Sequence, residues 1–256
     1  MDLELYSLMK TIKELINFDP MNYKERPLKR RLKVRMRALN IETFKEYEEY
    51  LKKNRDEQMK LKDTLTINVS KFFRNIEVFD ILKDEIIPSI KEPVRCWSAG
   101  CSTGEEAYTI AIILNEIGME GKIIGTDVDR DALEKAKEGV YTIFSMDEIP
   151  QSFISKYFEK EEGRYRIKDI LRKYVSFEEL DFKDVDKFFM RFDIILCRNV
   201  LIYLTKEFQN KLIKRFYELL DVPGFLVLGM AETLGFGMHE YFKPYKLRER
   251  IYKKDG

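Results

Sequence analysis

Two adjacent glutamates, Glu105 and Glu106, follow a turn of small residues in the stretch SAGCSTGEEAY, residues 98–108. The turn joins an apolar run typical of a strand, PVRCW, to one typical of a helix, TIAIILNEIG. It has neither the G-x-G-x-x-G pattern nor the lysine of a phosphate-binding loop. Because two carboxylates would repel a phosphate, the residues favour a ligand with hydroxyls, an amine or a positive charge. A tight strand–helix connection without a ligand is the alternative.

A third carboxylate, Asp127, ends the next strand-like run in GTDVD. Doubly wound folds place an acid at this point to bind ribose hydroxyls. Asp129 is a rival for this contact, or else a cap for the helix that follows, and Glu105 suits a first turn, where a carboxylate favours the helix dipole. A nucleoside without phosphate but with a cationic tail fits the set, and S-adenosylmethionine is such a ligand.

The elements that would position these carboxylates follow an alternating pattern from residue 69 onward. The expected strands are 94–98, 122–126, 175–179, 193–197 and 225–229, and the expected helices are 105–117, 130–138 and 206–220. This alternation predicts an α/β fold in which a parallel sheet is covered by helices. Between residues 139 and 175 the pattern weakens, and we expect a small β insertion there.

The first 65 residues predict a small helical domain. Residues 24–37, KERPLKRRLKVRMR, contain eight Lys or Arg and one Glu. An apolar stripe runs along this expected helix, and three cations, Arg30, Lys33 and Arg37, lie on its opposite face. A second helix is expected to start at Thr43, which forms a capping-box pattern with Glu46. Residues 51–65 are largely polar and suggest a connecting segment. The stripe consists of Leu28, Leu32, Met36 and Leu39.

The composition excludes several classes of protein. Over 256 residues, 46 Lys and Arg nearly balance 45 Asp and Glu, so there is no overall field that would attract nucleic acid or a membrane surface. Three scattered cysteines fit a reducing cytoplasm, and a single histidine makes a histidine-based metal site or triad improbable. We find no signal-peptide pattern and no membrane-spanning run. We therefore expect a cytoplasmic protein, without a metal and without membrane insertion, that is a monomer.

Five stretches, taken in order, resemble the CheR-type chemotaxis receptor (protein-glutamate) O-methyltransferases. They are NVSKFFRN (68–75), WSAGCSTGEEAYTIA (97–111), GTDVDRDALEKAKEGVY (125–141), LRKYVSFEELDF (171–182) and FDIILCRNVLIYL (192–204). The resemblance implies a helical N-terminal domain (1–65) and a Rossmann-like methyltransferase domain (66–256) with a small β insertion within 139–175. It also implies S-adenosylmethionine as methyl donor, with S-adenosylhomocysteine as product. The acceptors would be glutamate γ-carboxylates on cytoplasmic helices of chemoreceptors.

The resemblance also carries residue roles over by position. Ser70 stands where the family has Thr and keeps the hydroxyl. Asp181 and Phe182 stand where the family has Asn-Leu beside the adenine; a carboxylate still accepts a hydrogen bond from the adenine amine, so we expect binding to persist. The implied cofactor contacts are Asn68, Ser70, Arg74, Glu106, Asp127, Asp181, Phe182, Asn199 and Val200.

Arg74 and Tyr203 are the expected catalytic residues. Methyl transfer to a carboxylate needs no general base, because the acceptor is already ionised at pH 7. It needs alignment and a water-poor site. Arg74 would hold the acceptor carboxylate through its guanidinium, Tyr203 would donate a further hydrogen bond, and the resemblance points to the same two residues. A structural ion pair for Arg74 and plain packing for Tyr203 are the alternatives.

The basic face of the 24–37 helix would bind the acceptor protein. Arg30, Lys33 and Arg37 would complement acidic receptor helices, which speeds encounter and sets register. The alternatives for this face are a solvated surface or a nucleic-acid patch. For the whole chain, the alternatives are a cofactor-dependent enzyme with another acceptor and a regulatory module that binds the cofactor without catalysis. The basic helix argues against a small-molecule acceptor, and the presence of Arg74 and Tyr203 argues against a pure binding module.

Overall fold

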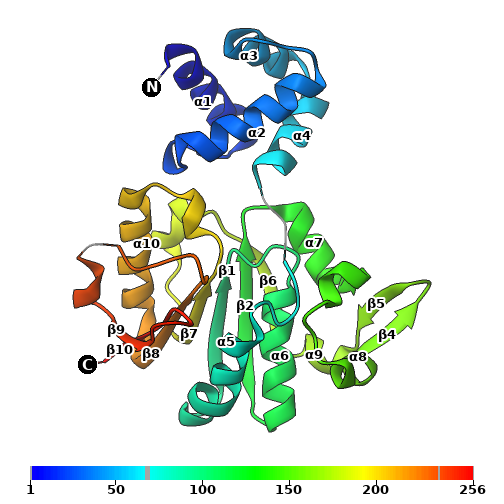
Figure 1. Ribbon diagram of the computed structural model, residues 1–256, viewed down its shortest axis with the longest axis vertical. Helices are drawn as coiled ribbons and strands as arrows, with labels where there is room; N and C mark the ends of the chain where they lie inside the picture. The colour runs from blue at the N-terminus through cyan, green and yellow to red at the C-terminus, as the bar shows by residue number, and fades with distance from the viewer. Residues whose placement is uncertain (1, 67–69, 236, 256) are drawn as a thin grey trace. The chain divides into compact units, whose positions relative to one another are not determined.

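Helices fill the first part of the chain. The computed structural model describes residues 2–66, 70–235 and 237–255 (Figure 1). Two compact units result: one contains Met1–Ile67 and Tyr203–Gln209, and the other contains Asn68–Ile202 and Asn210–Gly256. The helices of the first unit are α1 (Leu3–Ile16), α2 (Glu25–Ala38), α3 (Phe44–Lys53) and α4 (Arg55–Leu65).

The helical unit forms where the sequence pattern indicates amphipathic helices. The expected stripe of α2 is buried at Leu28, Leu32 and Met36, which share one apolar core with residues such as Leu5 of α1 and Leu61 of α4. The capping box is present at the start of α3, where the Thr43 hydroxyl accepts from the backbone N–H of residue 46. Our interpretation of residues 51–65 as a connecting segment is wrong. They contain the end of α3 and the whole of α4, which packs through a few apolar side chains only, and this explains the weak pattern.

A short segment from later in the chain completes this unit. The backbone N–H of Lys24 donates to the carbonyl of Tyr203 at 2.8 Å, and the N–H of Thr205 donates to the carbonyl of Asn22, also at 2.8 Å. Between these two bonds, Tyr23 and Leu204 form an antiparallel bridge. The segment Tyr203–Gln209 is therefore fixed to the start of α2 by backbone pairing.

The second unit is built on a seven-stranded mixed sheet of order β6-β2-β1-β7-β8-β10-β9. The first five strands in this order are parallel to their neighbours, whereas β10 and β9 are antiparallel. We expected only the parallel part, because the last two strands are short and mostly polar. The strands are β1 (Val94–Ala99), β2 (Gly121–Asp127), β6 (Val175–Glu179), β7 (Phe192–Cys197), β8 (Leu220–Leu228), β9 (Lys243–Lys246) and β10 (Ile251–Lys254).

Helices cover both faces of this sheet (Figure 1). On one face, α5 (Ile76–Ile81) and α6 (Glu105–Ile117) bury their apolar side chains with alternate residues of the strands, such as Cys96 and Ile194. On the other face, α10 (Lys206–Leu219) places the Phe216 ring 5.3 Å from the ring of Trp97. Strands buried on both faces read as continuous apolar runs, and this is why the sequence predicts them well.

A small three-stranded sheet of order β3-β5-β4 follows α7 (Arg130–Glu138). Its hairpin turns at Glu162 and Gly163, with φ of 47° and 78°, the left-handed pair that a two-residue turn requires. The short helices α8 (Gln151–Tyr157) and α9 (Asp169–Arg172) flank it. The domain limits that we gave, including those of the insertion, stay predictions. The strands are β3 (Val140–Tyr141), β4 (Phe158–Glu161) and β5 (Arg164–Ile167).

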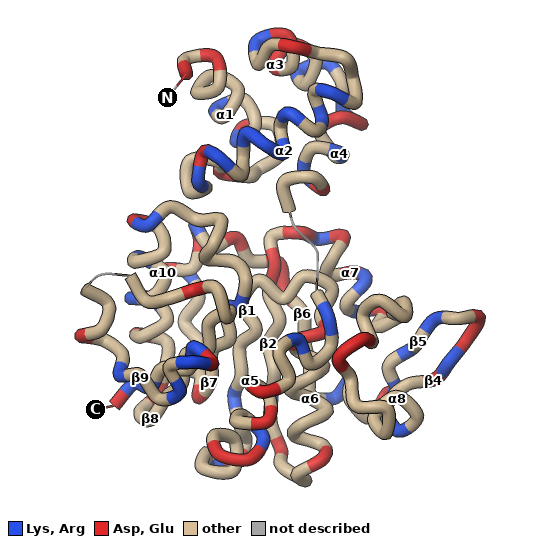
Figure 2. The backbone as a smooth tube through the Cα atoms, viewed as in Figure 1, with Lys and Arg blue, Asp and Glu red and all other residues tan. Residues whose placement is uncertain are grey.

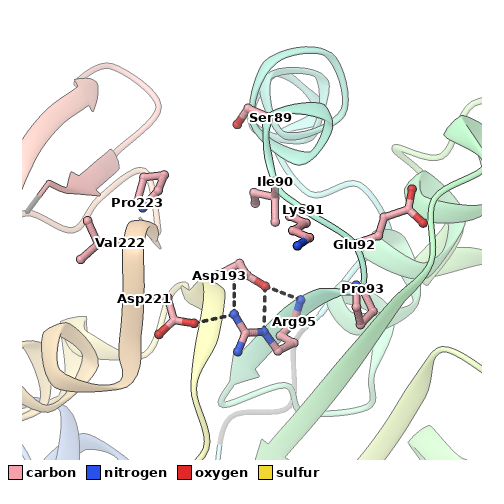
Figure 3. A pocket seen from close by; sticks show the side chains of 10 residues that line it. All are labelled: Ser89, Ile90, Lys91, Glu92, Pro93, Arg95, Asp193, Asp221, Val222 and Pro223. Atoms are coloured by element: carbon pink, nitrogen blue, oxygen red, sulfur yellow. Dashed lines mark hydrogen bonds and ion pairs between the residues drawn. The ribbon is translucent and has the colours of Figure 1, made fainter.

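A cavity of about 640 Å³ lies at the amino edge of the large sheet, away from the turns that follow β1, β2 and β7 (Figure 3). Arg95 crosses its floor and bonds to two carboxylates, with 2.7 Å from Nη2 to Asp193 Oδ1 and 2.5 Å to Asp221 Oδ2. These ion pairs join the amino ends of β1, β7 and β8. Three of the charged residues that line the cavity thus already satisfy one another.

Candidate functional site

The turn after β1 folds onto the end of β2. The backbone N–H groups of Gly100 and Cys101 both donate to the carbonyl of Thr126, at 2.8 and 2.9 Å. Gly100 and Gly104 have φ of 78° and 89°, and a Cβ on Gly104 would lie 2.8 Å from the Cβ of Ala136. Glycine is therefore required by backbone conformation and by space. The turn brings the start of α6 and the end of β2 to one place.

Asp127 lies at this place with its carboxylate oriented by the backbone. Its Oδ2 accepts from the N–H of Ser102 at 2.8 Å, and its Oδ1 accepts from the N–H of Asp129 at 3.0 Å. Burial raises the pKa of Asp127, and the nearby Asp129 adds to the rise. Asp129 itself caps α7 through the N–H groups of Asp131 and Ala132. Asp129 serves as a helix cap, whereas Asp127 has a carboxylate that the backbone orients and that can still accept hydrogen bonds from a ligand.

The two glutamates of the turn have different partners. Glu105 is buried, and it accepts from the hydroxyls of Thr103 at 2.7 Å and Ser145 at 3.0 Å. The hydroxyl of Ser70 also forms a hydrogen bond with Glu105. Ser70, which we predicted as a cofactor contact, therefore has a partner within the protein. Burial raises the pKa of Glu105. Glu106 accepts from the Ser98 hydroxyl at 2.7 Å.

Arg74 follows two phenylalanines, Phe72 and Phe73, which are both buried. Phe73 and Asn75 have φ of 52° and 62°, so the backbone around Arg74 is held in an uncommon conformation. Arg74 itself is half-buried. Asn68, the first predicted contact of this segment, lies outside the described residues.

Arg198 also lies at this edge, and our sequence analysis did not identify its role. Its Nη2 donates to the carbonyl of Arg74 at 2.8 Å and to Oδ1 of Asn75 at 3.0 Å, and its Nη1 lies 3.4 Å from Oε2 of Glu106. Its guanidinium also lies 5.2 Å from the ring centre of Phe79. Arg198 therefore ties the Arg74 segment, the start of α6 and the end of β7 together. The sequence signal that could have identified Arg198 is its place directly after the strand-like run FDIILC.

Asn199 and Val200 follow Arg198 at the end of β7. Asn199 has φ of 61° and donates its backbone N–H to Oε2 of Glu232 at 2.9 Å. Val200 covers the first turn so closely that a Cβ on Gly100 would lie 2.7 Å from its Cγ2. The structure thus brings the segments of Arg74, Glu106, Asp127 and Asn199 to the carboxyl edge of the sheet.

The predicted adenine pair lies after β6. Asp181 caps the next short helix through the N–H of Lys183 at 3.0 Å and forms an ion pair with the same lysine at 3.1 Å. The Phe182 ring is half-buried and lies 6.5 Å from that of Phe216. Because the N–H of Leu180 donates to the carbonyl of Asp127, this segment joins the same edge.

Tyr203 lies in the segment that completes the helical unit. The guanidinium of Arg31 lies 4.7 Å from the centre of the Tyr203 ring, and its Nη1 donates to the carbonyl of Leu65. Arg31 is buried, and burial lowers its pKa. Our sequence analysis assigned no role to Arg31; in the structure its guanidinium lies over the ring of Tyr203.

The three predicted acceptor-binding cations are exposed on α2. Figure 2 shows that Lys and Arg run along this helix. Arg35 and Lys29 are paired with Glu57 and Glu25, but among the described residues Arg30, Lys33 and Arg37 have no ion-pair partner. Arg26 is exposed on the same helix. A row of unpaired cations is available to a partner of opposite charge.

The comparisons with known proteins agree on one family. The model described as "CheR methyltransferase, SAM binding domain" matches residues 68–251, and "CheR methyltransferase, all-alpha domain" matches residues 3–66. The chain is 32% identical to a chemotaxis protein methyltransferase of Borreliella burgdorferi, over 98% of this chain and 94% of that protein.

Two further relatives carry the same name. The chain is 34% identical to the protein of Listeria innocua, over 88% of each chain, and 34% identical to that of Salmonella typhimurium, over 82% of this chain and 77% of that protein. Across the described residues, every helix is too short or too polar to span a bilayer. From the family models and the relatives together, the chain belongs to the CheR methyltransferase family.

Proposed function

We propose that this protein transfers a methyl group from S-adenosylmethionine to glutamate side chains on the cytoplasmic helices of chemoreceptors. The observation that carries the proposal is the gathering of Asp127, Glu106 and the Arg74 segment at the carboxyl edge of one sheet. Ligands bind at this edge in doubly wound folds. Family membership supports the methyltransferase activity; the acceptor and the residue roles are our inference.

The residues of this edge fit a cationic nucleoside. Asp127 is an acceptor whose two oxygens are each fixed by one backbone N–H, which suits a pair of ribose hydroxyls. Glu105, Glu106 and Asp127 concentrate negative charge around the first turn, which suits an amine and a sulfonium. S-adenosylmethionine supplies an electrophilic methyl group on its sulfonium. Asp127 is half-buried, and hydroxyl donors of a ligand would stabilise its ionised form against the desolvation that raises its pKa.

Arg74 and Tyr203 are the groups that we assign to the acceptor carboxylate. The backbone of Arg74 is fixed by Arg198, so its side chain starts from a defined position. Tyr203 is fixed through its own carbonyl by Lys24 and through its ring by Arg31. Each of them is a donor in a defined position, and a donor that aims an ionised carboxylate does not have to remove a proton.

The exposed cations of α2 support a macromolecular acceptor. Arg30, Lys33 and Arg37 recur at spacings of three and four residues, so they form one row along the helix. An acidic helix of the acceptor would match a row of this kind. A small-molecule acceptor would leave the row without a function.

The first experiment is a calorimetric titration of the wild-type protein with S-adenosylhomocysteine, with Asp127→Ala and Arg74→Ala in parallel. We expect wild-type binding and a loss of about 10- to 100-fold in affinity for Asp127→Ala, the range for removing a charged hydrogen-bond acceptor. Asp131→Ala is the matched control, because Asp131 is an exposed carboxylate in the first turn of α7. A folded wild-type protein that does not bind S-adenosylhomocysteine would refute the cofactor assignment.

Chemoreceptor fragments and tritium-labelled donor then identify the product. A glutamate methyl ester releases labelled methanol in base, whereas an N-methyl product does not. Base-stable label would refute the carboxylate acceptor while leaving the cofactor site intact. Binding without any transfer would favour a regulatory module.

A further inference from the structure

Glu232 lies beyond β8 and is buried, with an exposed fraction of 4%. Its Oε2 accepts from the N–H of Gly229 at 2.6 Å and from that of Asn199 at 2.9 Å, and its Oε1 accepts from the N–H of Ile202 at 3.1 Å. The N–H of Leu201 bonds to the same carboxylate. One side chain therefore binds backbone donors from the loop after β7 and from the end of β8.

This carboxylate compensates an unfavourable loop. Asn199 has φ of 61°, a left-handed conformation that is uncommon for non-glycine residues and that asparagine adopts more readily than most. The buried N–H groups of a tight loop need acceptors, because leaving a buried N–H unpaired is unfavourable. Glu232 supplies acceptors for several of them at one point.

Gly229 shows how closely the parts fit. A Cβ at this position would lie 2.7 Å from Oε2 of Glu232 and 2.7 Å from the backbone nitrogen of Asn199. Real Cβ atoms do not come so close to other atoms, so a side chain here would displace the carboxylate or the loop. The end of β8 is thus shaped to admit Glu232 to the loop.

We infer that Glu232 is a positioning residue for the cofactor site: it holds the loop Asn199–Ile202 in the conformation that presents Asn199 and Val200 to the ligand. The inference rests on the proposed function, because it takes these two residues as cofactor contacts. Glu232 acts through the loop and does not itself touch the ligand. Its loss should therefore weaken binding of the nucleoside even where the fold survives.

A matched control lies at the opposite edge of the same sheet. Asp193, with an exposed fraction of 7%, accepts from the backbone N–H of Arg95 at 2.8 Å and from its guanidinium (Figure 3). Like Glu232, it is a buried carboxylate bonded to a backbone donor at the end of a strand. A general loss of stability would follow from either amide substitution, because an NH2 group would then face a backbone donor, whereas a loss specific to the cofactor site would follow from Glu232 alone.

The test compares Glu232→Gln with Asp193→Asn by calorimetric titration with S-adenosylhomocysteine and by thermal unfolding. Glutamine keeps one acceptor but turns an NH2 group toward the backbone donors, so we expect the Kd to rise about 10- to 100-fold. Asp193→Asn should lower the Tm and leave the Kd unchanged. An unchanged Kd in Glu232→Gln, or equal Kd changes in both variants, would overturn the inference.

A second measurement keeps the inference separate from the proposed function. Amide hydrogen exchange of Asn199, Leu201, Ile202 and Gly229 should be faster in Glu232→Gln than in the wild type, with no ligand present. If Glu232→Gln does not fold, Gly229→Ala takes its place in both measurements, with the same expected changes. Wild-type protein that fails to bind overturns both proposals, whereas wild-type binding with unaltered exchange in the variant overturns this one alone.

Discussion

Three carboxylates at the carboxyl edge, those of Glu105, Asp127 and Glu232, have pKa values that burial raises. Each accepts hydrogen bonds from N–H or hydroxyl groups that oppose this rise. For each, the folded protein binds a proton more readily than the unfolded chain does. The ionised form therefore lowers stability above the raised pKa, and the edge retains negative charge at the expense of stability.

This shift makes cofactor affinity sensitive to acid. As the pH falls, Asp127 gains a proton at a higher pH than the usual aspartate value of about 3.9, and one oxygen then becomes a donor. We expect the affinity for S-adenosylhomocysteine to decline on acidification, beginning above that value. Calorimetric titrations across pH measure it. In Asp127→Asn the affinity should be low and should vary less with pH, and an equally steep decline there would assign the effect to another group.

Gly100 offers a second test at the scale of single residues. Gly100→Ala would place a methyl group 2.7 Å from Cγ2 of Val200, whereas Gly118, with φ of 70°, has no atom within 4 Å of a Cβ. We expect both alanine variants to lose roughly 1–2 kcal/mol of unfolding free energy through backbone strain. Only Gly100→Ala should also raise the Kd for S-adenosylhomocysteine. Equal Kd values in the two variants would show that Val200 does not contribute to the site.

The sequence could predict which carboxylates gather at this edge but not which of them meet the ligand. Asp127 and Glu106 follow from their places after strand and turn. The roles of Arg198 and Glu232 depend on which backbone groups of distant segments lie beside them, and no spacing along the chain encodes that. Arg31 shows the same limit, because helical periodicity does not reveal that an aromatic ring from residue 203 covers it.

At the scale of elements, the two faces of α2 have different functions. One face buries Leu28, Leu32 and Met36 and turns Arg31 toward Tyr203. The other carries the exposed cations Arg30, Lys33 and Arg37. The helix that would meet the acceptor is thus also the helix that fixes Tyr203, and changes on its exposed face should leave the cofactor site unaltered.

Charge reversal on α2 tests this division. Arg30→Glu with Lys33→Glu should lower kcat/KM for a chemoreceptor by about tenfold or more at low salt, because complementary charge speeds encounter. The loss should shrink as salt rises, and the Kd for S-adenosylhomocysteine should stay at the wild-type value. Lys45→Glu with Lys53→Glu is the control, since it changes the net charge equally at exposed positions of α3. An equal loss of kcat/KM in the control would show that the effect depends on overall charge and not on the exposed face of α2.

Elements were predictable where their own residues carry a clear hydrophobic pattern, either the continuous run of a buried element or the one-sided pattern of an amphipathic one. The sequence predicts α6, α7 and β6 with the bounds that the structure has. It misses β9 and β10, since an antiparallel edge of short polar strands is defined by its pairing partners and hardly by its own residues. It also misses α4, whose apolar contacts are too few to dominate a polar stretch.

At the scale of the whole molecule, the chain leaves the helical unit, builds most of the sheet and returns as Tyr203–Gln209 before α10 continues. The returning segment is joined by backbone bonds and by the bridge between Tyr23 and Leu204, whose side chain is buried. The N-terminal helices therefore do not make up the complete helical unit, which also contains the segment Tyr203–Gln209.

Leu204→Ala should destabilise the helical unit by about 2–5 kcal/mol, the range for a buried leucine. Amide hydrogen exchange should then accelerate in α1 and α2. Leu226→Ala in β8 removes an equally buried leucine from the other unit, so it should accelerate exchange in the sheet and leave α1 and α2 unchanged. Unchanged exchange of α1 and α2 in Leu204→Ala would show that the returning segment is dispensable.

The returning segment also limits how this architecture can be recombined. A gene fusion that transplants only residues 1–66 onto another enzyme would carry helices that lack the strand-like partner of Tyr23. A recipient must already supply an equivalent of Tyr203–Gln209 at the right place in its own chain. We therefore expect the two units to be inherited together. Chimeras of this family should fold when the exchanged piece includes both parts of the helical unit.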